Sequence, residues 1–358
     1  MFHHYSLVLK DYSHASSWII NSGLGKVGAC GVDIFFAISG FIMVYTTQRK
    51  AGVSDAFVFV KKRALRIYPL YWVWSTALLA LWVGGIALTS HHYPTGFLVD
   101  SFLLIPSFNG HSYHPFLDQG WTLSFEMLFY GVFASAILLR PKNSRLAFLV
   151  AAFAMLSCLS ILLPSNSGIR YLVSDHIIIE FLYGVLAAEV LLRLPAVRAA
   201  SWMRSLPFAL MIIGVVALLE TVKLNVSDSM RFVMYGLPAL LIVFGAAMRG
   251  SVPCHPLLVY FGDASYSIYL THGFFSMAYG MALKHFSLLT RLPADTTIIA
   301  AGIITICLSS LSHLAIERPL TRLASDRKSP PTPENQPTGS MSGLSSLCEV
   351  SRTSIVSR

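Results

Sequence analysis

The sequence predicts an all-α protein, a polytopic bundle of transmembrane helices with about nine spans. Two observations on composition support this fold class: 55% of the 358 residues are hydrophobic, and only 12% carry a charge. Soluble globular domains carry roughly 25% charged residues, so this composition excludes that class of protein. The third observation is that apolar stretches near the length of a bilayer span, about 20 residues, recur along the whole chain.

Nine of these apolar stretches are assigned as spans, although some are short for a full crossing. A further stretch, 97–109, is too short to span a bilayer and is predicted as a partial or interfacial segment. The nine stretches are 28–47, 67–88, 121–139, 146–163, 177–192, 207–222, 232–248, 265–284 and 297–316.

The chain opens with an apolar, aromatic segment that contains His3, His4 and Tyr5, and it then turns polar through residues 10–21. We expect residues 1–27 to hold the last turn of a helix that lacks its beginning, followed by an extracytoplasmic loop. Histidine titrates near neutral pH, so the histidine pair is a candidate general base. The alternative is a pair of interfacial histidines at a frayed terminus.

The stretch 28–47 is apolar, yet it contains Asp33 near one end and the small pair Ser39–Gly40. An ionised carboxylate at the centre of a membrane helix costs roughly 2.5–3.5 kcal/mol on insertion scales. Such a residue is retained where it faces protein or water, which makes Asp33 a candidate functional residue. The alternative places it at headgroup depth near a helix start, where the helix dipole stabilises a carboxylate.

Residues 61–72 combine a basic helix face with aromatic side chains. Arg63 and Arg66 are three residues apart and therefore share one helix face, a short distance before Tyr71. A guanidinium group matches the oxygens of a phosphate, so the two arginines are candidates to bind a phosphate-bearing ligand. The alternative is that they only anchor the membrane topology.

Two later stretches carry polar groups within apolar sequence. Residues 120–130 contain Ser124 and Glu126, and a carboxylate there is expected to orient a histidine or to pair with an arginine. The alternative is an intramembrane hydrogen bond that only joins helices. Residues 265–272 end in His272, which is either a second polar group of a cavity or a packed helix residue.

Connections that are rich in lysine and arginine alternate along the chain with connections that are poor in them. The connection 48–66 holds six lysines and arginines, whereas 89–120 holds none. The positive-inside rule therefore places 48–66 and the C-terminus in the cytoplasm. Residues 28–319 form the predicted transmembrane domain, and residues 320–358, rich in Ser, Pro and Thr, are predicted to be a disordered cytoplasmic tail.

The net charge and the cysteines predict neither a nucleic-acid partner nor a disulfide framework or metal site. The net charge of +9 does not indicate nucleic-acid binding, because the basic residues of a membrane protein lie mainly in cytoplasmic loops. The five cysteines are scattered, without a CxxC motif or a cluster of Cys and His, so neither a disulfide framework nor a metal site is predicted.

Six stretches, in this order, resemble the acyltransferase 3 family of bacterial integral membrane proteins, and within it the O-acetyltransferases of exopolysaccharide and O-antigen. Each motif alone is weak, but six in the family's order are specific, and they extend from residue 2 to residue 319. They are FHH at 2–4, GVDIFFAISGFIM at 31–43, KKRALRIYPLYW at 61–72, WTLSFEMLFYGVF at 121–133, YSIYLTH at 266–272 and ERP at 317–319.

The resemblance implies a bundle of ten helices in the bacterial inner membrane that takes an acyl group, usually acetyl, from cytoplasmic acetyl-CoA. The acceptor is a hydroxyl of an extracytoplasmic or lipid-linked glycan. In the family the first helix carries an Arg, ten further residues and a catalytic His. His3 matches this histidine and the Arg has no counterpart, so most of the first helix is expected to be missing here.

The resemblance also implies roles for the candidate residues. His3 accepts a proton from the acceptor hydroxyl, and Asp33 or Glu126 holds its imidazole in the reactive tautomer. No metal is required. Acetyl-CoA is expected to contact Arg63 and Arg66 through its phosphates and Ser39 and Ser124 through its acyl carbonyl, and the acceptor to contact His4, Tyr71, Trp121 and His272.

Three other functions remain open. A transporter or flippase of glycan intermediates should show broken helices in two symmetric halves, whereas the polar groups of this chain concentrate in residues 1–130. A second class of membrane O-acyltransferase is built around an intramembrane His and Asn, a pair that we find in no long apolar stretch. The third is an inactive remnant of an acyltransferase, because the family's Arg has no counterpart.

Overall fold

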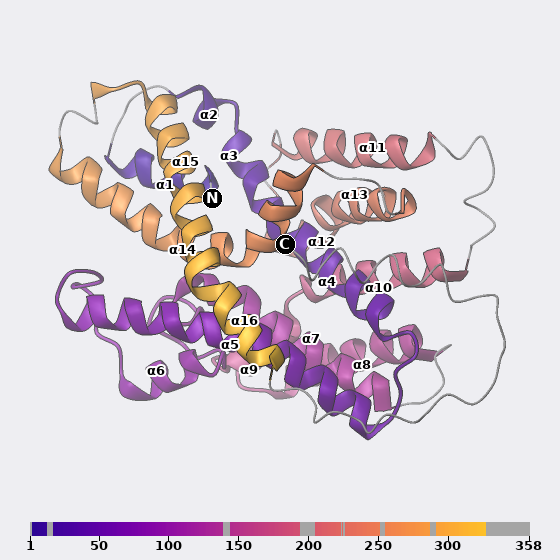
Figure 1. Cartoon of the computed structure of the whole chain (residues 1–358). Coiled ribbons are helices and arrows are strands. Elements are labelled where there is room, and N and C mark those ends of the chain that lie inside the picture. Colours follow the sequence, from indigo (N-terminus) through magenta and orange to yellow (C-terminus); the bar gives the residue numbers. More distant parts are fainter. Residues whose placement is uncertain are drawn as a thin grey trace, which may run out of the picture. The chain divides into compact units, whose positions relative to one another are not determined.

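Every regular element that the structure describes is a helix (Figure 1). The structure is a computed structural model, and it describes residues 2–12, 17–138, 144–193, 205–222, 224, 226–250, 255–286 and 291–326. The predicted all-α class is therefore confirmed. The described residues up to Arg322 form one compact unit, and Leu323–Asp326 belong to a second. The predicted disorder of the tail from residue 327 onward lies outside the described residues.

Each of the nine predicted spans overlaps a helix, and the short stretch 97–109 overlaps α6. The helices are α1 (Phe2–Tyr12), α2 (Trp18–Asn21), α3 (Leu24–Val27), α4 (Gly31–Thr47), α5 (Val53–Val83), α6 (Thr95–Phe102), α7 (Trp121–Leu138), α8 (Arg145–Leu159), α9 (Gly168–Ser174), α10 (Ile178–Arg193), α11 (Leu206–Thr221), α12 (Arg231–Met234), α13 (Gly236–Met248), α14 (Pro256–His285), α15 (Ala294–Ser312) and α16 (Arg318–Asp326).

Five helical stretches among the described residues are long and apolar enough to cross a membrane. The number of nine spans stays a prediction. The five stretches are Gly28–Thr47, Asp118–Leu138, Arg145–Leu162, Arg231–Met248 and Ala294–Leu323.

Helices extend beyond the boundaries that we expected in three places. Helix α1 continues to Tyr12, well past a single last turn. Helix α5 begins at Val53 and runs through Pro69, so most of the predicted connection 48–66 is helical. A proline inside a helix costs about 3 kcal/mol in isolation, and here the packing of buried neighbours such as Leu70 offsets this cost. Helix α16 continues to Asp326, past the expected start of the tail.

Helices α4 and α10 contact each other backbone to backbone. A Cβ atom placed on Gly184 of α10 would lie 1.9 Å from the carbonyl oxygen of Ala37. In the reciprocal contact, a Cβ atom on Gly40 of α4 would lie 2.0 Å from the carbonyl oxygen of Phe181. Small residues permit this close approach of membrane helices, and any larger side chain would push the two helices apart.

The substitution Gly184→Ala is therefore expected to destabilise the protein by about 1–3 kcal/mol, as overpacking of a close contact does. The matched control is Gly131→Ala on α7, because a Cβ atom there would meet nothing within 4 Å. Thermal unfolding in detergent measures both variants. Equal melting temperatures for the two would contradict the tight α4–α10 contact.

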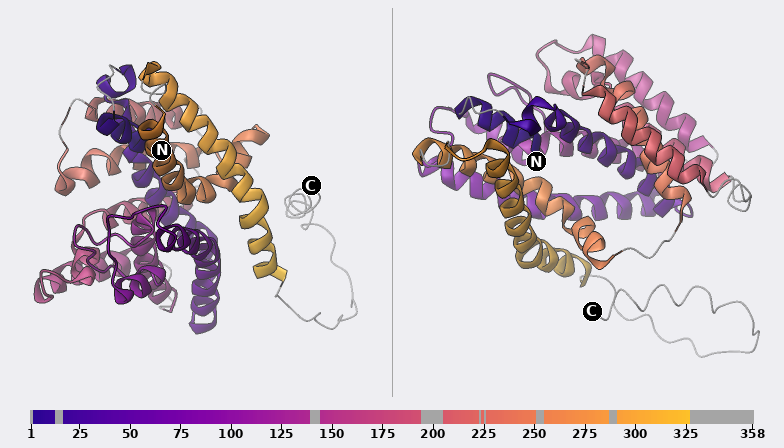
Figure 2. Two further views of the ribbon diagram at one scale, coloured as in Figure 1. Left: turned by 90° about the vertical axis from the view of Figure 1, so that its left-hand side faces the viewer. Right: turned by 90° about the horizontal axis from the view of Figure 1, so that it is seen from above.

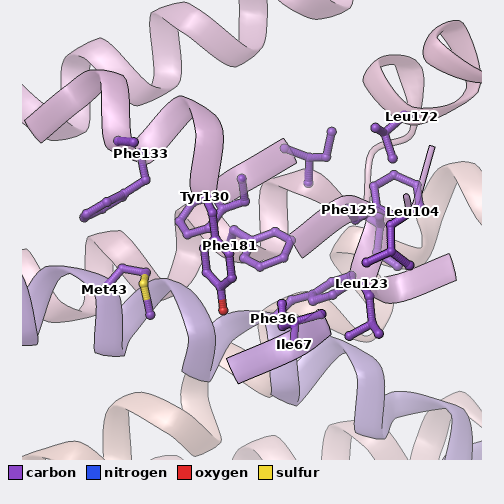
Figure 3. Close-up of a cluster of buried hydrophobic side chains, with 14 of the residues drawn as sticks. Phe36, Met43, Ile67, Leu104, Leu123, Phe125, Tyr130, Phe133, Leu172 and Phe181 are labelled. Atoms are coloured by element: carbon purple, nitrogen blue, oxygen red, sulfur yellow. The ribbon is translucent and has the colours of Figure 1, made fainter. Parts of the chain in front are cut away.

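The main apolar core lies where α4, α7 and α10 meet. The ring of Phe181 stacks between two others, with its centroid 4.3 Å from that of Phe36 and 4.4 Å from that of Phe129. Figure 3 shows Phe36, Phe181 and Tyr130 within this cluster. These three helices therefore form a rigid frame around the polar residues described below.

Helix α1 lies beside α14 and α15 (Figures 1 and 2), and a second, smaller apolar cluster holds these helices together. Tyr5 and Leu9 of α1 are buried there against Leu283 and Ile298. The hydroxyl groups of Tyr5 and Thr305 form a hydrogen bond beside this cluster. The position of α1, and with it that of His3 and His4, is fixed by these contacts.

Candidate active site

Buried polar side chains line one face of α7. Thr122, Glu126 and Tyr130 follow one another at intervals of four residues, so they lie on the same face of the helix. Their exposed fractions are 1%, 5% and 3%. From the first to the last, the helix rises about 12 Å, at 1.5 Å per residue. This polar row joins two clusters of side chains at its ends.

The histidine cluster, at the Thr122 end, consists of His3 and His4 from α1 and His272 from α14. The ring centroids of His4 and His272 are 5.0 Å apart, and those of His3 and His4 are 5.6 Å apart. Nδ1 of His3 lies 3.1 Å from the carbonyl oxygen of Gly25. A carbonyl oxygen only accepts, so Nδ1 carries the proton of the neutral ring and Nε2 is the basic nitrogen.

Tyr269 connects the histidine cluster to the polar row. Its hydroxyl lies 2.7 Å from Oγ1 of Thr122 and donates to the carbonyl of Gln119 at 2.9 Å. Its own carbonyl accepts a hydrogen bond from Nδ1 of His272. A Cβ atom on Gly273 would lie only 2.1 Å from Nε2 of Gln119, so the glycine leaves room for that side chain. Together these contacts fix α14 against the start of α7.

The arginine cluster, at the Tyr130 end, consists of Arg63 and Arg66 on α5 with Glu126 and Ser39. Glu126 accepts hydrogen bonds from the hydroxyl of Tyr130 and, at 3.4 Å, from that of Ser39. The guanidinium of Arg63 lies 5.7 Å from the ring centroid of Tyr130. The charges of Arg63 and Arg66 are close enough to act on Glu126. Of the two predicted partners of Glu126, the structure therefore places arginine near it.

A carboxylate and an imidazole fasten the end of α15 beside this cluster. Oε2 of Glu317 accepts from Nδ1 of His313 at 2.8 Å and from the hydroxyl of Ser267 at 2.6 Å. The neighbouring Tyr266 donates to the carbonyl of Ile67, next to Arg66, at 2.8 Å. The five residues His313–Glu317 form a π-helical turn, a rare element that often occurs at functional sites.

Asp33 is fully buried and forms an ion pair with Arg231, which the sequence analysis did not single out. Nη2 of Arg231 donates to Oδ2 at 2.6 Å and Nε donates to Oδ1 at 3.1 Å. Glu180 of α10, also fully buried, lies beside the pair. The position of Glu180 within the predicted span 177–192 could have marked it as a candidate residue, because ionisable residues inside spans are often functional or paired with other polar groups.

The two carboxylates that we expected to hold the imidazole of His3 have other partners. Asp33 is bound by Arg231, and Glu126 accepts from hydroxyl groups at the arginine cluster. The backbone carbonyl of Gly25 orients the imidazole instead. Helix α1 itself packs against α3, α14 and α15, and a carboxylate contact to His3 stays a prediction.

The other predicted residues do not converge on one point. Ser124 lies two residues from its neighbours in the polar row and so projects from the opposite side of α7, where it is buried. The hydroxyl of Tyr71 donates to the carbonyl of Ser101 at 2.7 Å, which fastens α6 to α5. The ring of Trp121 stacks on that of His114, with centroids 5.5 Å apart.

This arrangement suits the transfer of a group between two ligands that enter at opposite ends of the polar row. Guanidinium groups at one end favour an anionic ligand such as a phosphate. A basic Nε2 nitrogen at the other end favours proton abstraction from a hydroxyl. Among the residues that the structure describes, no three His, Cys, Asp or Glu side chains gather as metal ligands.

Comparisons with known proteins extend these observations. A family model described as an acyltransferase domain, of the acyltransferase 3 type, matches residues 1–313. The exopolysaccharide production protein ExoZ of Rhizobium meliloti (strain 1021) is 32% identical over an alignment of 313 residues, and this alignment covers 84% of this chain and 92% of that protein. No solved structure matches the chain significantly.

Proposed function

Because the chain belongs to the acyltransferase 3 family and is a multi-pass membrane protein, we propose that it transfers an acetyl group from acetyl-CoA to a hydroxyl of an exopolysaccharide or related glycan. The relative from Rhizobium meliloti is a protein of exopolysaccharide production, which supports this class of acceptor. The observation that carries the proposal is the buried polar row of α7, with three histidines at one end and two arginines at the other.

At the histidine cluster, the acceptor hydroxyl meets His3. Nε2 accepts the hydroxyl proton while the oxygen attacks the carbonyl carbon of the acetyl thioester. A new C–O ester bond forms, the C–S bond breaks, and the imidazolium returns the proton to the thiolate of CoA. A positioned general base contributes about 10²–10⁴-fold to such a rate. His4 and His272 line the acceptor side.

At the arginine cluster, Arg63 and Arg66 bind the phosphates of acetyl-CoA. The flexible arm that joins these phosphates to the thioester lies along the polar row, toward His3. Ser39 remains the candidate hydroxyl for the developing oxyanion, because it faces Glu126 at 3.4 Å. Glu126 balances the charge of the two arginines between turnovers.

The proposed orientation places the arginine cluster at the cytoplasmic face of a bacterial inner membrane and the histidine cluster at the opposite face. The six basic residues of 48–66 support a cytoplasmic position for this segment, and the C-terminus lies on the same side. A cytoplasmic donor and an extracytoplasmic acceptor, free or lipid-linked, then approach the polar row from opposite ends.

The test is transfer of radiolabel from [14C]acetyl-CoA into glycan in membranes that contain the whole chain. Membranes without the chain are the control, and labelled butyryl-CoA tests the size of the acyl group. We expect label in alkali-labile esters of the glycan, from acetyl-CoA above all. If the protein is stably inserted and the glycan carries no label, the proposal is overturned. In a parallel assay with glycan labelled in its sugar, movement of that glycan across the vesicle membrane without acetylation would support the transporter alternative.

A further inference from the structure

We infer that Arg231 and Asp33 are positioning residues for His3, because their ion pair holds the backbone segment on which the imidazole rests. This inference takes its kinetic consequence from the proposed function, whereas its structural consequence is independent of it. The segment consists of residues 25–30, which are the end of α3 and the 3-10 turn Gly28–Cys30 that precedes α4.

The guanidinium of Arg231 binds three oxygen atoms at the start of α4. Two belong to the carboxylate of Asp33, at 2.6 and 3.1 Å, and the third is the carbonyl oxygen of Ala29, at 3.1 Å. The ring of Tyr235 lies 5.5 Å from the guanidinium carbon and limits its movement from one side. Arg231, at the start of α12, therefore fixes the backbone immediately before α4.

His3 contacts the same segment at two points. Its Nδ1 nitrogen donates to the carbonyl of Gly25 at 3.1 Å. A Cβ atom placed on Gly28 would lie 3.5 Å from both the Cβ atom and the backbone nitrogen of His3, so α1 lies directly on this glycine. Gly28 precedes Ala29, whose carbonyl Arg231 binds. A displacement of Ala29 would therefore reach His3 through a single covalent neighbour.

The chemistry of the pair favours a positioning role over a purely stabilising one. Asp33 is fully buried, and a buried ion pair is often no more stabilising than apolar residues of the same volume. A guanidinium has a planar fork of donors that binds a carboxylate and a neighbouring carbonyl at once. A lysine ammonium lacks this fork. Arg231→Lys should therefore keep the charge and lose the geometry.

The test compares Arg231→Met, Arg231→Lys and Asp33→Asn in the full chain, with Arg249→Met as the matched control. Arg249 is exposed and follows directly after α13, and its guanidinium lies 4.6 Å from the ring centroid of Phe208. The first measurement is the rate at which diethyl pyrocarbonate modifies His3, followed by mass spectrometry of the N-terminal peptide. The second is kcat and KM for acetyl transfer.

We expect Arg231→Met and Asp33→Asn to change the modification rate of His3 several-fold and to lower kcat by about 10²-fold, because a misplacement of about 1 Å has an effect of this size. KM for acetyl-CoA should remain unchanged in these variants. For Arg231→Lys, we expect a modification rate and a kcat between those of the unaltered chain and those of Arg231→Met. The control should match the unaltered chain in both measurements.

An unchanged modification rate of His3 in a folded Arg231→Met or Asp33→Asn variant would overturn the inference, whatever the activity. A changed rate, with no acetyl transfer by any form of the protein, would uphold the positioning role and overturn the proposed function. If the Met variant does not fold, Arg231→Lys and Asp33→Asn decide the question by the same two measurements.

Discussion

Replacement of His3 by alanine is expected to lower kcat for acetyl transfer by about 10²–10⁴-fold, the contribution of a positioned general base. The ring is a suitable base because the carbonyl of Gly25 binds Nδ1, which leaves the basic lone pair on Nε2. Alanine removes this lone pair, and we expect no change in the arginine cluster, which lies at the other end of the polar row. KM for acetyl-CoA should therefore stay within about twofold of its original value.

Two further variants separate the base from its surroundings. His3→Asn keeps a donor that can reach the carbonyl of Gly25 and lacks the basic nitrogen, so it should be as inactive as the alanine variant. His92→Ala removes an exposed histidine from the loop between α5 and α6 and should be fully active. Activity of His3→Ala above a tenth of the original would contradict the assignment of His3 as the base.

The helical fold follows from local features of the sequence, and the prediction holds best where those features are strongest. Long apolar stretches such as 121–139 and 232–248 form helices close to the expected residues, because a bilayer requires internally bonded backbone. Helix α5 differs, since its first half carries a cluster of basic residues and was assigned to the connection 48–66, and since the helix runs through Pro69. Packing against α7 maintains the helix there. Hydropathy along the sequence carries no information on such packing between helices.

The candidate site shows a similar division. The ordered motifs predicted the family, which is confirmed, and the spacing of Arg63 and Arg66 predicted their shared face on α5. The partner of Asp33 was not predictable, because Arg231 lies 198 residues away in the sequence. Hydropathy and spacing describe one helix at a time, whereas such a pair depends on how α4 and α12 meet. The contact between His3 and the carbonyl of Gly25 was not predictable for the same reason, because it depends on how α1 and α3 meet.

Replacement of Arg63 or Arg66 by methionine is expected to raise KM for acetyl-CoA by about 10–100-fold each. A hydrogen bond to a charged group contributes roughly 1.5–3 kcal/mol, and 1.4 kcal/mol corresponds to a factor of ten. If the guanidinium groups bind the phosphates and not the reacting atoms, kcat should fall much less than KM rises. The measurement is initial-rate kinetics in proteoliposomes over a range of acetyl-CoA concentrations.

Lys62→Met is the matched control, because Lys62 lies on the same helix, is exposed and carries the same charge. Loss of charge at the membrane surface alone would affect all three variants alike, whereas phosphate binding affects the arginine variants selectively. Arg63 also lies 5.6 Å from the ring centroid of Phe59, so its replacement removes a contact within the fold. Arg66 is exposed, so its variant should show the rise in KM without loss of thermal stability. Equal KM values for Arg66→Met and Lys62→Met would therefore exclude Arg66 from donor binding.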